Sequence, residues 1–207
     1  MGKKIVSRDL AMKTERYIKE YEKLFDGLEN KDIKLFELGI LQGNSLLMWR
    51  DYFEKGIIVG LDIDDVKIPD ETGRIKTYKG SQDDFTLLTT ISNEIAPEGF
   101  DIIIDDASHM GNLTRKSFWH LFENHLKSGG IYVIEDWGTG YWQSWPDGKA
   151  FVPGQPHFAG MVGFIKELVD ECGVESWSAG KYNAPPARIT KFTNMQILFG
   201  QVFITKR

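Results

Sequence analysis

Short apolar segments alternate with helical segments along most of this chain, and no other sequence feature constrains the fold as strongly. The apolar segments are too short for stable helices and hold few polar residues, which is typical of strands buried on both faces of a sheet. Parallel strands need helical crossovers, and the intervening segments have helical spacing. We predict strands at residues 33–38, 57–63, 75–78, 100–105 and 131–134, and helices at 44–53, 85–95, 113–126 and 158–172.

Both ends of the chain depart from this alternation. Residues 188–192 and 197–205 are rich in β-forming residues and predict an antiparallel hairpin with Asn194 in its turn. With the earlier strands this makes an α/β fold: a doubly wound, mostly parallel seven-stranded sheet with a C-terminal antiparallel hairpin. At the other end, apolar residues recur at helical spacing over residues 8–28 and predict a helix that precedes the sheet.

Composition and charge fit one domain and exclude several classes of protein. The 207 residues include 25 basic and 30 acidic side chains, and this net charge of −5 argues against a protein that binds nucleic acid through its backbone. The single cysteine, Cys172, excludes a disulfide within the chain and a cysteine-based zinc cluster. Since neither a signal peptide nor a membrane-spanning run is recognisable, we expect a cytoplasmic protein without a membrane partner.

The first strand is followed by a glycine turn that suits a ligand. Ligands of an open parallel sheet bind at the carboxyl ends of its strands. Here Glu37 and Gly39 lead to Gly43 and Asn44. The glycines allow a backbone to approach a ligand closely, and Asn44 and Ser45 can cap the next helix, whose N-terminus favours anions. The dinucleotide pattern G-x-G-x-x-G is absent, and Glu37 favours a cationic or zwitterionic ligand over a pyrophosphate. An ordinary strand-to-helix turn is the alternative, and this motif alone does not decide between the two.

Polar residues also follow the second and third strands. Asp62 lies about 20 residues beyond the glycine turn, a position that suits hydrogen bonds from ribose hydroxyls, although a solvated loop acid is the alternative. After the third strand, Ser81 and Gln82 offer polar groups where an adenine edge would lie. The alternative that Ser81 or Asp83 only caps the next helix is favoured on this evidence alone.

Carboxylates are concentrated after the fourth and fifth strands. Asp105, Asp106 and His109 follow one strand, and Glu135 and Asp136 follow its expected neighbour. Two carboxylates about 4 Å apart repel each other by about 4 kcal/mol at an effective dielectric of 20, so three in one site call for a cation. Oxygen ligands favour Mg²⁺, Mn²⁺ or Ca²⁺. Glu135 and Asp136 are adjacent, so both face one ion only if the strand has already ended. Alternatively, some of these acids are helix caps or contact a ribose or an amine.

A loop over residues 137–156 is rich in glycine, proline and tryptophan. Long loops in compact domains are usually functional, so this one is a candidate lid or platform with Tyr141 and Trp142 as substrate contacts. The alternative is a loop that packs its own aromatic side chains onto the core.

These motifs resemble those of class I S-adenosylmethionine-dependent methyltransferases. Glu37-Leu38-Gly39 with Gly43 is similar to their first motif, and Asp62 is similar to their ribose-binding acid. Within that superfamily the chain resembles the metal-dependent macrolide sugar O-methyltransferases (the mycinamicin and macrocin group) and the cephalosporin-hydroxylase-like group. The specific stretches are residues 105–109 and 134–142, and the resemblance covers roughly residues 33–145.

The resemblance implies an S-adenosylmethionine-dependent O-methyltransferase in which Mg²⁺ or another hard divalent cation assists methylation of a hydroxyl on a sugar or other small-molecule diol. It implies His109 as general base, and Asp106, Glu135 and Asp136 as metal ligands. It also implies that Glu37, Gly39, Asp62, Ser81 and Asp105 line the cofactor pocket, to which the strand ends add Gly43, Asn44 and Gln82. Ala107 and Gly140 depart from the family pattern.

Other functions and the organisation of the chain stay open at this stage. A non-catalytic S-adenosylmethionine-binding module and a cephalosporin-hydroxylase-like enzyme are the alternative functions, although two histidines for an iron site are not evident in the central motif. We expect an N-terminal helical extension over residues 1–30 and a methyltransferase domain over 31–207, acting on a small-molecule substrate. A homo-oligomer formed through the N-terminal helix is possible.

Overall fold

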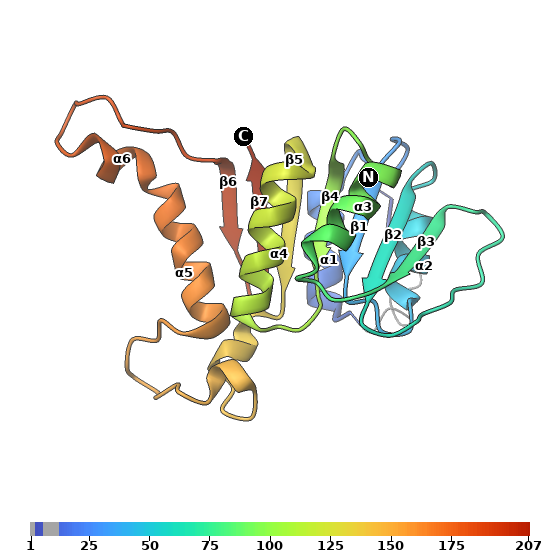
Figure 1. The fold of residues 1–207 in the computed structure, drawn as a ribbon, viewed down its shortest axis with the longest axis horizontal. Helices are drawn as coiled ribbons and strands as arrows, with labels where there is room; N and C mark the ends of the chain where they lie inside the picture. Colours follow the sequence, from blue (N-terminus) through green and yellow to red (C-terminus); the bar gives the residue numbers. More distant parts are fainter. Residues whose placement is uncertain (1–2, 6–12) are drawn as a thin grey trace.

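The computed structural model of the protein describes residues 3–5 and 13–207 (Figure 1). Its strands are β1 (Lys34–Leu38), β2 (Ile57–Asp62), β3 (Ile75–Lys79), β4 (Phe100–Asp105), β5 (Leu126–Glu135), β6 (Phe192–Ile197) and β7 (Gln201–Lys206). They form one seven-stranded sheet in the order β3-β2-β1-β4-β5-β7-β6. The pairs from β3 to β5 are parallel, and β7 is antiparallel to both β5 and β6. The predicted doubly wound α/β fold is confirmed.

Helices cover both faces of this sheet. The helices are α1 (Glu15–Leu24), α2 (Asn44–Tyr52), α3 (Phe85–Ile95), α4 (Gly111–Asn124), α5 (Gly160–Cys172) and α6 (Val174–Ala179). One apolar core joins the sheet to α1 and α2, and a second joins it to α3, α4 and α5. Short 3₁₀ helices, η1 (Trp137–Tyr141) and η2 (Pro146–Gly148), interrupt the loop after β5. In the part of the chain that the structure describes, no helix has the length and apolar character needed to cross a bilayer.

Alternation along β1 places a carboxylate inside the molecule. Leu35 packs in the core on the α1 and α2 side, whereas Phe36 and Leu38 pack in the core on the opposite side. Successive side chains of a strand point to opposite faces, so Glu37 shares the side of Leu35. Glu37 is fully buried there. A charged group in a central strand needs a partner, and the partner comes from the N-terminal segment.

Most predicted elements lie within two residues of their observed bounds, including β1, β2, β3, β4, α2, α3 and α5. The predicted helix over 8–28 is present as α1 from Glu15 to Leu24, and residues 8–12 lie outside the described part of the chain. The helix predicted over 113–126 begins and ends two residues earlier, and the strand predicted over 131–134 is longer, since β5 begins at Leu126. The expected closure of the helix by Ser128, Gly129 and Gly130 is wrong, because they belong to β5, where Gly129 has a φ of +75° and the pairing with β4 shifts register.

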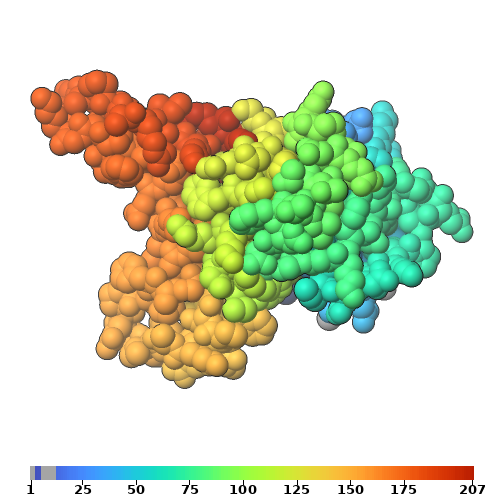
Figure 2. Space-filling view, viewed as in Figure 1, coloured from blue at the N-terminus to red at the C-terminus, as the bar shows by residue number. Residues whose placement is uncertain are grey.

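The predicted position of the hairpin turn is also wrong. Asn194 lies within β6 and pairs with Thr205 of β7, and the chain reverses at residues 198–200 instead. Gly200 has a φ of +74°, which a glycine adopts without strain and which closes the turn. The adjacent Leu198 and Phe199 are apolar residues that are typical of strands, so the sequence pattern did not indicate a turn at this position. Helix α6 was not predicted. The segment that contains α6 and the loop over residues 137–156 both project from one side of the molecule (Figure 2).

The connection between β2 and β3 is held by one buried carboxylate. The side chain of Asp70 is 4% exposed and accepts hydrogen bonds from the backbone nitrogens of Arg74 and Ile75, each 2.9 Å long. It also accepts one from the hydroxyl of Thr72 and pairs with Arg50 of α2. Burial acts to raise the pKa of Asp70, but these hydrogen bonds outweigh it and hold the pKa well below its ordinary value.

We expect Asp70→Asn to lower the free energy of unfolding by about 1–3 kcal/mol, because buried donors lose their acceptor. A carboxyl whose pKa is depressed by folding stabilises the protein above its unfolded pKa, about 3.9, and loses that effect as pH falls further. The difference from wild type, measured by urea unfolding, should therefore be full at pH 7 and smaller at pH 3. Asp65→Asn, at a carboxylate that is 62% exposed, is the control and should have little effect. A difference that does not change with pH would contradict this role of the charge.

Candidate active site

A cavity of about 1020 Å³ opens at the carboxyl ends of β1, β2, β4 and β5, where open parallel sheets bind their ligands. This volume is at the upper end of the range for small-molecule and cofactor sites. Its walls come from the start of α1, the turn before α2 and the loop after β5. The predicted site residues that line it are Gly39, Asn44, Asp62, Asp106, His109, Glu135, Asp136, Tyr141 and Trp142.

The other predicted cofactor residues are not among those that line the cavity: Glu37, Gly43, Ser81, Gln82 and Asp105. Asp105 is buried and accepts hydrogen bonds from Ser117 at 2.6 Å and from Gln82 at 3.1 Å. Burial raises the pKa of Asp105 to about 6. The Gln82 side chain in turn accepts a hydrogen bond from the Ser108 backbone nitrogen. This network supports the segment that carries Asp106 and His109, and a direct cofactor contact by these residues stays a prediction.

The glycine turn after β1 is tied to the ends of the neighbouring strands. Gly39 has a φ of +79°, and a Cβ there would lie 2.4 Å from the Cα of Ala107. Only glycine fits such a close approach. Asp62 of β2 accepts hydrogen bonds from the backbone nitrogens of Ile40 and Leu41, each 2.9 Å long. The turn and Asp62 therefore form one ordered wall of the cavity.

Helix α2 begins at this wall with an open N-terminus. Its N-cap is Gly43, with a φ of +79°, and no side chain caps the helix, so the predicted capping by Asn44 and Ser45 is wrong. Asn44 and Ser45 of the first turn line the cavity. Uncapped backbone N–H groups and the helix dipole favour a negatively charged group at this position.

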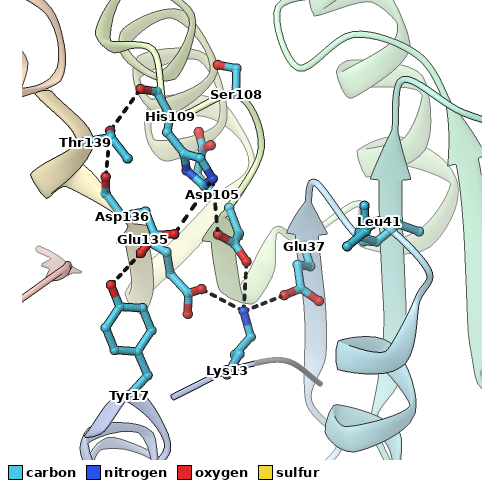
Figure 3. Close-up of polar contacts among 12 residues, drawn as sticks. Lys13, Tyr17, Glu37, Leu41, Asp105, Ser108, His109, Glu135, Asp136 and Thr139 are labelled. Atoms are coloured by element: carbon cyan, nitrogen blue, oxygen red, sulfur yellow. Dashed lines mark hydrogen bonds and ion pairs between the residues drawn. The ribbon is translucent and has the colours of Figure 1, made fainter. Parts of the chain in front are cut away.

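A lysine that sequence analysis did not single out lies at the centre of the acidic cluster (Figure 3). The Nζ atom of Lys13 lies 2.7 Å from Glu135, 3.0 Å from Asp106 and 3.3 Å from Glu37. The side chain of Lys13 is 4% exposed, and the side chains of Glu37 and Glu135 are 0% and 2% exposed. The three carboxylates come from β1, β5 and the residue after β4, so the sheet order brings them to one cation.

Two tyrosines of α1 complete this contact. The hydroxyl of Tyr17 donates to Oδ1 of Asp136 at 2.5 Å, and the hydroxyl of Tyr21 donates to Oε1 of Glu135. Burial and the neighbouring carboxylates raise the pKa of both hydroxyls, so both keep their protons for these bonds. Tyr17 and Tyr21 are four residues apart, which places them on one side of α1, and Lys13 immediately precedes the N-cap of that helix, Thr14.

Burial and the positive charge of Lys13 determine the directions in which the pKa values of this cluster shift. Burial raises the pKa of Glu37, and burial with the charge of Glu135 raises the pKa of Asp106. Burial also acts to raise the pKa of Glu135, but Lys13 and the Tyr21 hydroxyl outweigh it and lower that pKa. Burial acts to lower the pKa of Lys13, and the carboxylates outweigh it, so the ammonium group keeps its proton.

A second group of ligand atoms faces the cavity. Nε2 of His109 lies 4.0 Å from Oδ1 of Asp106 and 3.9 Å from Oδ2 of Asp136, and the three residues offer ligand atoms within 4.8 Å of one another. Asp136 has a φ of +52° immediately after the end of β5. The strand thus ends between the two adjacent acids, and both Glu135 and Asp136 line the cavity. Two carboxylates and an imidazole at this spacing suit a divalent cation.

His109 is held in an unusual backbone conformation by the loop after β5. Its φ is +51°, and its carbonyl oxygen accepts hydrogen bonds from Thr139 at 3.3 Å and from Trp145 at 3.2 Å. Burial lowers the pKa of the imidazole, against the opposing effect of Asp136. The neutral ring is therefore the form available near pH 7, and it can accept a proton.

One carboxylate fixes the same loop to two helices. Oδ2 of Asp147 accepts hydrogen bonds from the backbone nitrogens of Gly111 at 2.6 Å and Met161 at 2.7 Å, in the first turns of α4 and α5. A Cβ at Gly160 would lie 2.4 Å from the Asp147 carboxyl carbon, so this contact also requires a glycine. Within the loop, Tyr141 packs against Phe151, whereas Trp142 is 57% exposed at the cavity.

Known proteins are similar to this chain in both sequence and fold. No family model matches it. It is 40% identical over 157 residues to the demethylmacrocin O-methyltransferase of Streptomyces fradiae, which is 72% of this chain and 38% of that protein. It is 38% identical over 157 residues to the mycinamicin VI 2''-O-methyltransferase of Micromonospora griseorubida, with the same shares of the two chains.

Solved structures give the same relationship. The MycE methyltransferase of the mycinamycin pathway, solved with Mg and SAH, superposes with a TM-score of 0.78 and 29% identity, over 99% of this chain and 54% of that one. Its complex with Mg, SAH and mycinamycin VI has a TM-score of 0.75 and 31% identity, over 92% and 48% of the two chains. The chain thus spans about half of that structure and about two fifths of the sequence relatives it matches.

We expect Asp147→Ala to loosen the loop over 137–156, because the first turns of α4 and α5 lose a shared acceptor. The expected loss of stability is about 1–3 kcal/mol, and hydrogen exchange should become faster in the loop and at Gly111 and Met161. Asp170→Ala, at an exposed carboxylate on α5, is the matched control and should leave both unchanged. Exchange in the loop that stays at the wild-type rate would show that Asp147 does not hold it.

Proposed function

From the membership of this chain in the class I S-adenosylmethionine-dependent methyltransferases of the macrocin and mycinamicin group, we propose that it methylates a hydroxyl of a sugar or of another small molecule with neighbouring oxygens. The observation that carries the proposal is one cavity that joins a glycine turn with Asp62 on one side to Asp106, His109 and Asp136 on the other. The first wall suits a zwitterionic nucleoside cofactor, and the second suits a cation and a proton acceptor.

The residues of the first wall fit S-adenosylmethionine. The uncapped N-terminus of α2, at Asn44, would hold the carboxylate of its amino-acid part. Asp62, which lines the cavity beside the glycine turn, would accept hydrogen bonds from the ribose hydroxyls. When bound, S-adenosylmethionine supplies the activated methyl group. Gly39 lines the cavity, and its missing side chain makes room for the backbone of Ala107, which lines the cavity beside Asp106.

The residues of the second wall fit a hard divalent cation such as Mg²⁺. Asp106 and Asp136 each direct one oxygen toward the N-terminal segment and the other toward His109. These outward oxygens would hold the ion, which supplies a Lewis acid and a template for two neighbouring acceptor oxygens. Glu135 as a third ligand remains a prediction, because its two oxygens accept hydrogen bonds from Lys13 and Tyr21.

His109 is the proposed general base. Its Nε2 atom faces the cavity between the outward carboxylate oxygens, and it would accept the proton of the acceptor hydroxyl. Thr139 and Trp145 hold the backbone of His109, so the ring is oriented before the acceptor binds. Exposed Trp142 offers an apolar surface for the rest of the acceptor.

The division into an extension over 1–30 and a domain over 31–207 also remains our proposal.

We expect His109→Ala to lower turnover by a factor of about 10²–10⁴, the usual contribution of a general base, without weakening cofactor binding. Turnover would be measured with S-adenosylmethionine and Mg²⁺, and with demethylmacrocin and mycinamicin VI as the first acceptors tested. Calorimetric titration would measure cofactor binding. His120→Ala, on α4 and stacked on Phe85, is the matched control and should keep wild-type turnover. Wild-type turnover in His109→Ala would exclude His109 as the base.

We expect the two walls to be separable by mutation. Asp62→Ala should weaken S-adenosylmethionine binding at least about tenfold, which is 1.4 kcal/mol, because the ribose loses its acceptor. Asp136→Asn should abolish the heat of Mg²⁺ binding in chelator-treated protein and leave cofactor binding in place. NAD⁺ is the control ligand, and Asp65→Asn is the control variant. An absence of S-adenosylmethionine binding to the wild-type protein would contradict the proposed function itself.

A further inference from the structure

We propose that the ammonium group of Lys13 stands in for two cations of the loaded site, the divalent cation and the ammonium group of S-adenosylmethionine, and that these two replace it cooperatively. Lys13 thereby couples the binding of the cofactor to the binding of the metal ion. This inference deepens the proposed function and rests on it, because it requires a cavity that takes both ligands.

The contacts of Lys13 belong to both proposed ligand sites (Figure 3). Its Nζ atom lies 2.7 Å from Oε2 of Glu135 and 3.0 Å from Oδ2 of Asp106, two of the predicted metal ligands. The same atom lies 3.3 Å from Oε1 of Glu37, two residues before Gly39 of the glycine turn in the cofactor wall. One ammonium group thus neutralises carboxylates that two different cations would occupy.

Glu37 is suited to a compact cation with hydrogen-bond donors. Its side chain is fully buried, and Oε2 accepts a hydrogen bond from Ser45 at 2.6 Å. Oε1 makes no hydrogen bond among the described residues, and its ion-pair partner is Lys13. Buried carboxylate oxygens are normally hydrogen-bonded. When Lys13 leaves, the ammonium group of S-adenosylmethionine, with three donors, would satisfy this oxygen.

Either ligand alone leaves a buried acid without its cation. A metal ion that takes the place of Lys13 at Asp106 and Glu135 leaves Glu37 buried and unpaired, which is unfavourable. A cofactor ammonium group at Glu37 lies beside Lys13 and repels it, and the loss of Lys13 leaves Asp106 and Glu135 unpaired. When both ligands bind, each of these carboxylates has a cation and Lys13 is displaced only once. Each ligand therefore tightens the binding of the other, and this effect is reciprocal.

The position of Lys13 allows its side chain to leave while α1 stays folded. Lys13 lines the cavity and immediately precedes Thr14, the N-cap of α1. The helix itself is anchored in the core by the buried side chains of Tyr17, Ile18 and Tyr21. Since open space lies next to Lys13, its side chain can turn into the cavity and toward solvent.

The test measures the affinity for Mn²⁺ in chelator-treated protein, from the electron paramagnetic resonance signal of the free ion, with and without saturating S-adenosylhomocysteine. This product carries the ammonium group of the cofactor but no sulfonium charge. We expect it to tighten Mn²⁺ binding to the wild type at least about fivefold, the lower end of the usual range for coupled sites. Methylthioadenosine, which lacks the amino-acid part, should leave the affinity for Mn²⁺ unchanged.

Lys13→Met removes the ammonium group and keeps an apolar side chain of similar length. We expect this variant to bind Mn²⁺ at least about tenfold more tightly than the wild type without S-adenosylhomocysteine, because no cation has to leave. S-adenosylhomocysteine should then give no further gain. Lys19→Met, at a lysine of α1 that is 61% exposed, is the matched control and should keep the wild-type coupling. Lys13→Gln serves for the same measurements if Lys13→Met does not fold.

An equal effect of S-adenosylhomocysteine in the wild type and in Lys13→Met would overturn this inference and leave the proposed function standing. The same holds for a wild type whose affinity for Mn²⁺ does not respond to S-adenosylhomocysteine, or responds equally to methylthioadenosine. If neither protein bound Mn²⁺ with or without S-adenosylhomocysteine, the metal part of the proposed function would fail, and this inference with it.

Chemical labelling follows the displacement of Lys13 directly. Its side chain is 4% exposed in the free protein, so acetylation by acetic anhydride should be slow there. Mn²⁺ and S-adenosylhomocysteine together should speed this acetylation several-fold, as measured by peptide mass spectrometry. Exposed Lys19 is the internal control and should react at one rate throughout. A Lys13 that stays protected with both ligands bound would show that they do not displace it.

Discussion

The pairing of buried carboxylates with one lysine is the interaction on which the rest of this site depends. Glu37 and Glu135 are almost completely removed from water, and burial of an unpaired carboxylate is very costly. Lys13 and the hydroxyl of Tyr21 supply the compensation from the N-terminal segment. This segment is therefore a part of the site, although it precedes the sheet in the chain.

Sheet topology explains why the acids meet at all. β1 lies between β2 and β4, and β5 lies beside β4, so the carboxyl ends of these strands share one edge. Leu38 is in register with Asp105, and Asp105 is in register with Ile134. The residues one step beyond, Gly39, Asp106 and Glu135, consequently come together. The left-handed conformation of Asp136 then turns the chain so that a second carboxylate from the same strand reaches the cavity.

Features that depend on local spacing were predictable from the sequence. The alternation of apolar strands and helices indicated the fold, and the strand ends indicated Asp106, His109, Glu135 and Asp136. Features that depend on distant contacts were not. Lys13 is 122 residues from Glu135, and nothing in its neighbourhood distinguishes it from a solvated lysine. The hairpin turn was missed for a different reason, because the apolar Leu198 and Phe199 conceal a glycine with positive φ.

The two walls of the cavity differ in charge and hydrogen-bonding groups, so they suit different ligands. The glycine turn, Asp62 and the open end of α2 offer backbone groups and one acid, which suits a ligand with hydroxyls and a negative end. The opposite wall of the cavity offers closely spaced carboxylates and a neutral imidazole, which suit a cation and a proton. Because Gly39 brings the turn into contact with Ala107, the two surfaces are adjacent. A methyl donor bound to one would lie beside an acceptor oxygen held at the other, and this proximity is what an in-line transfer requires.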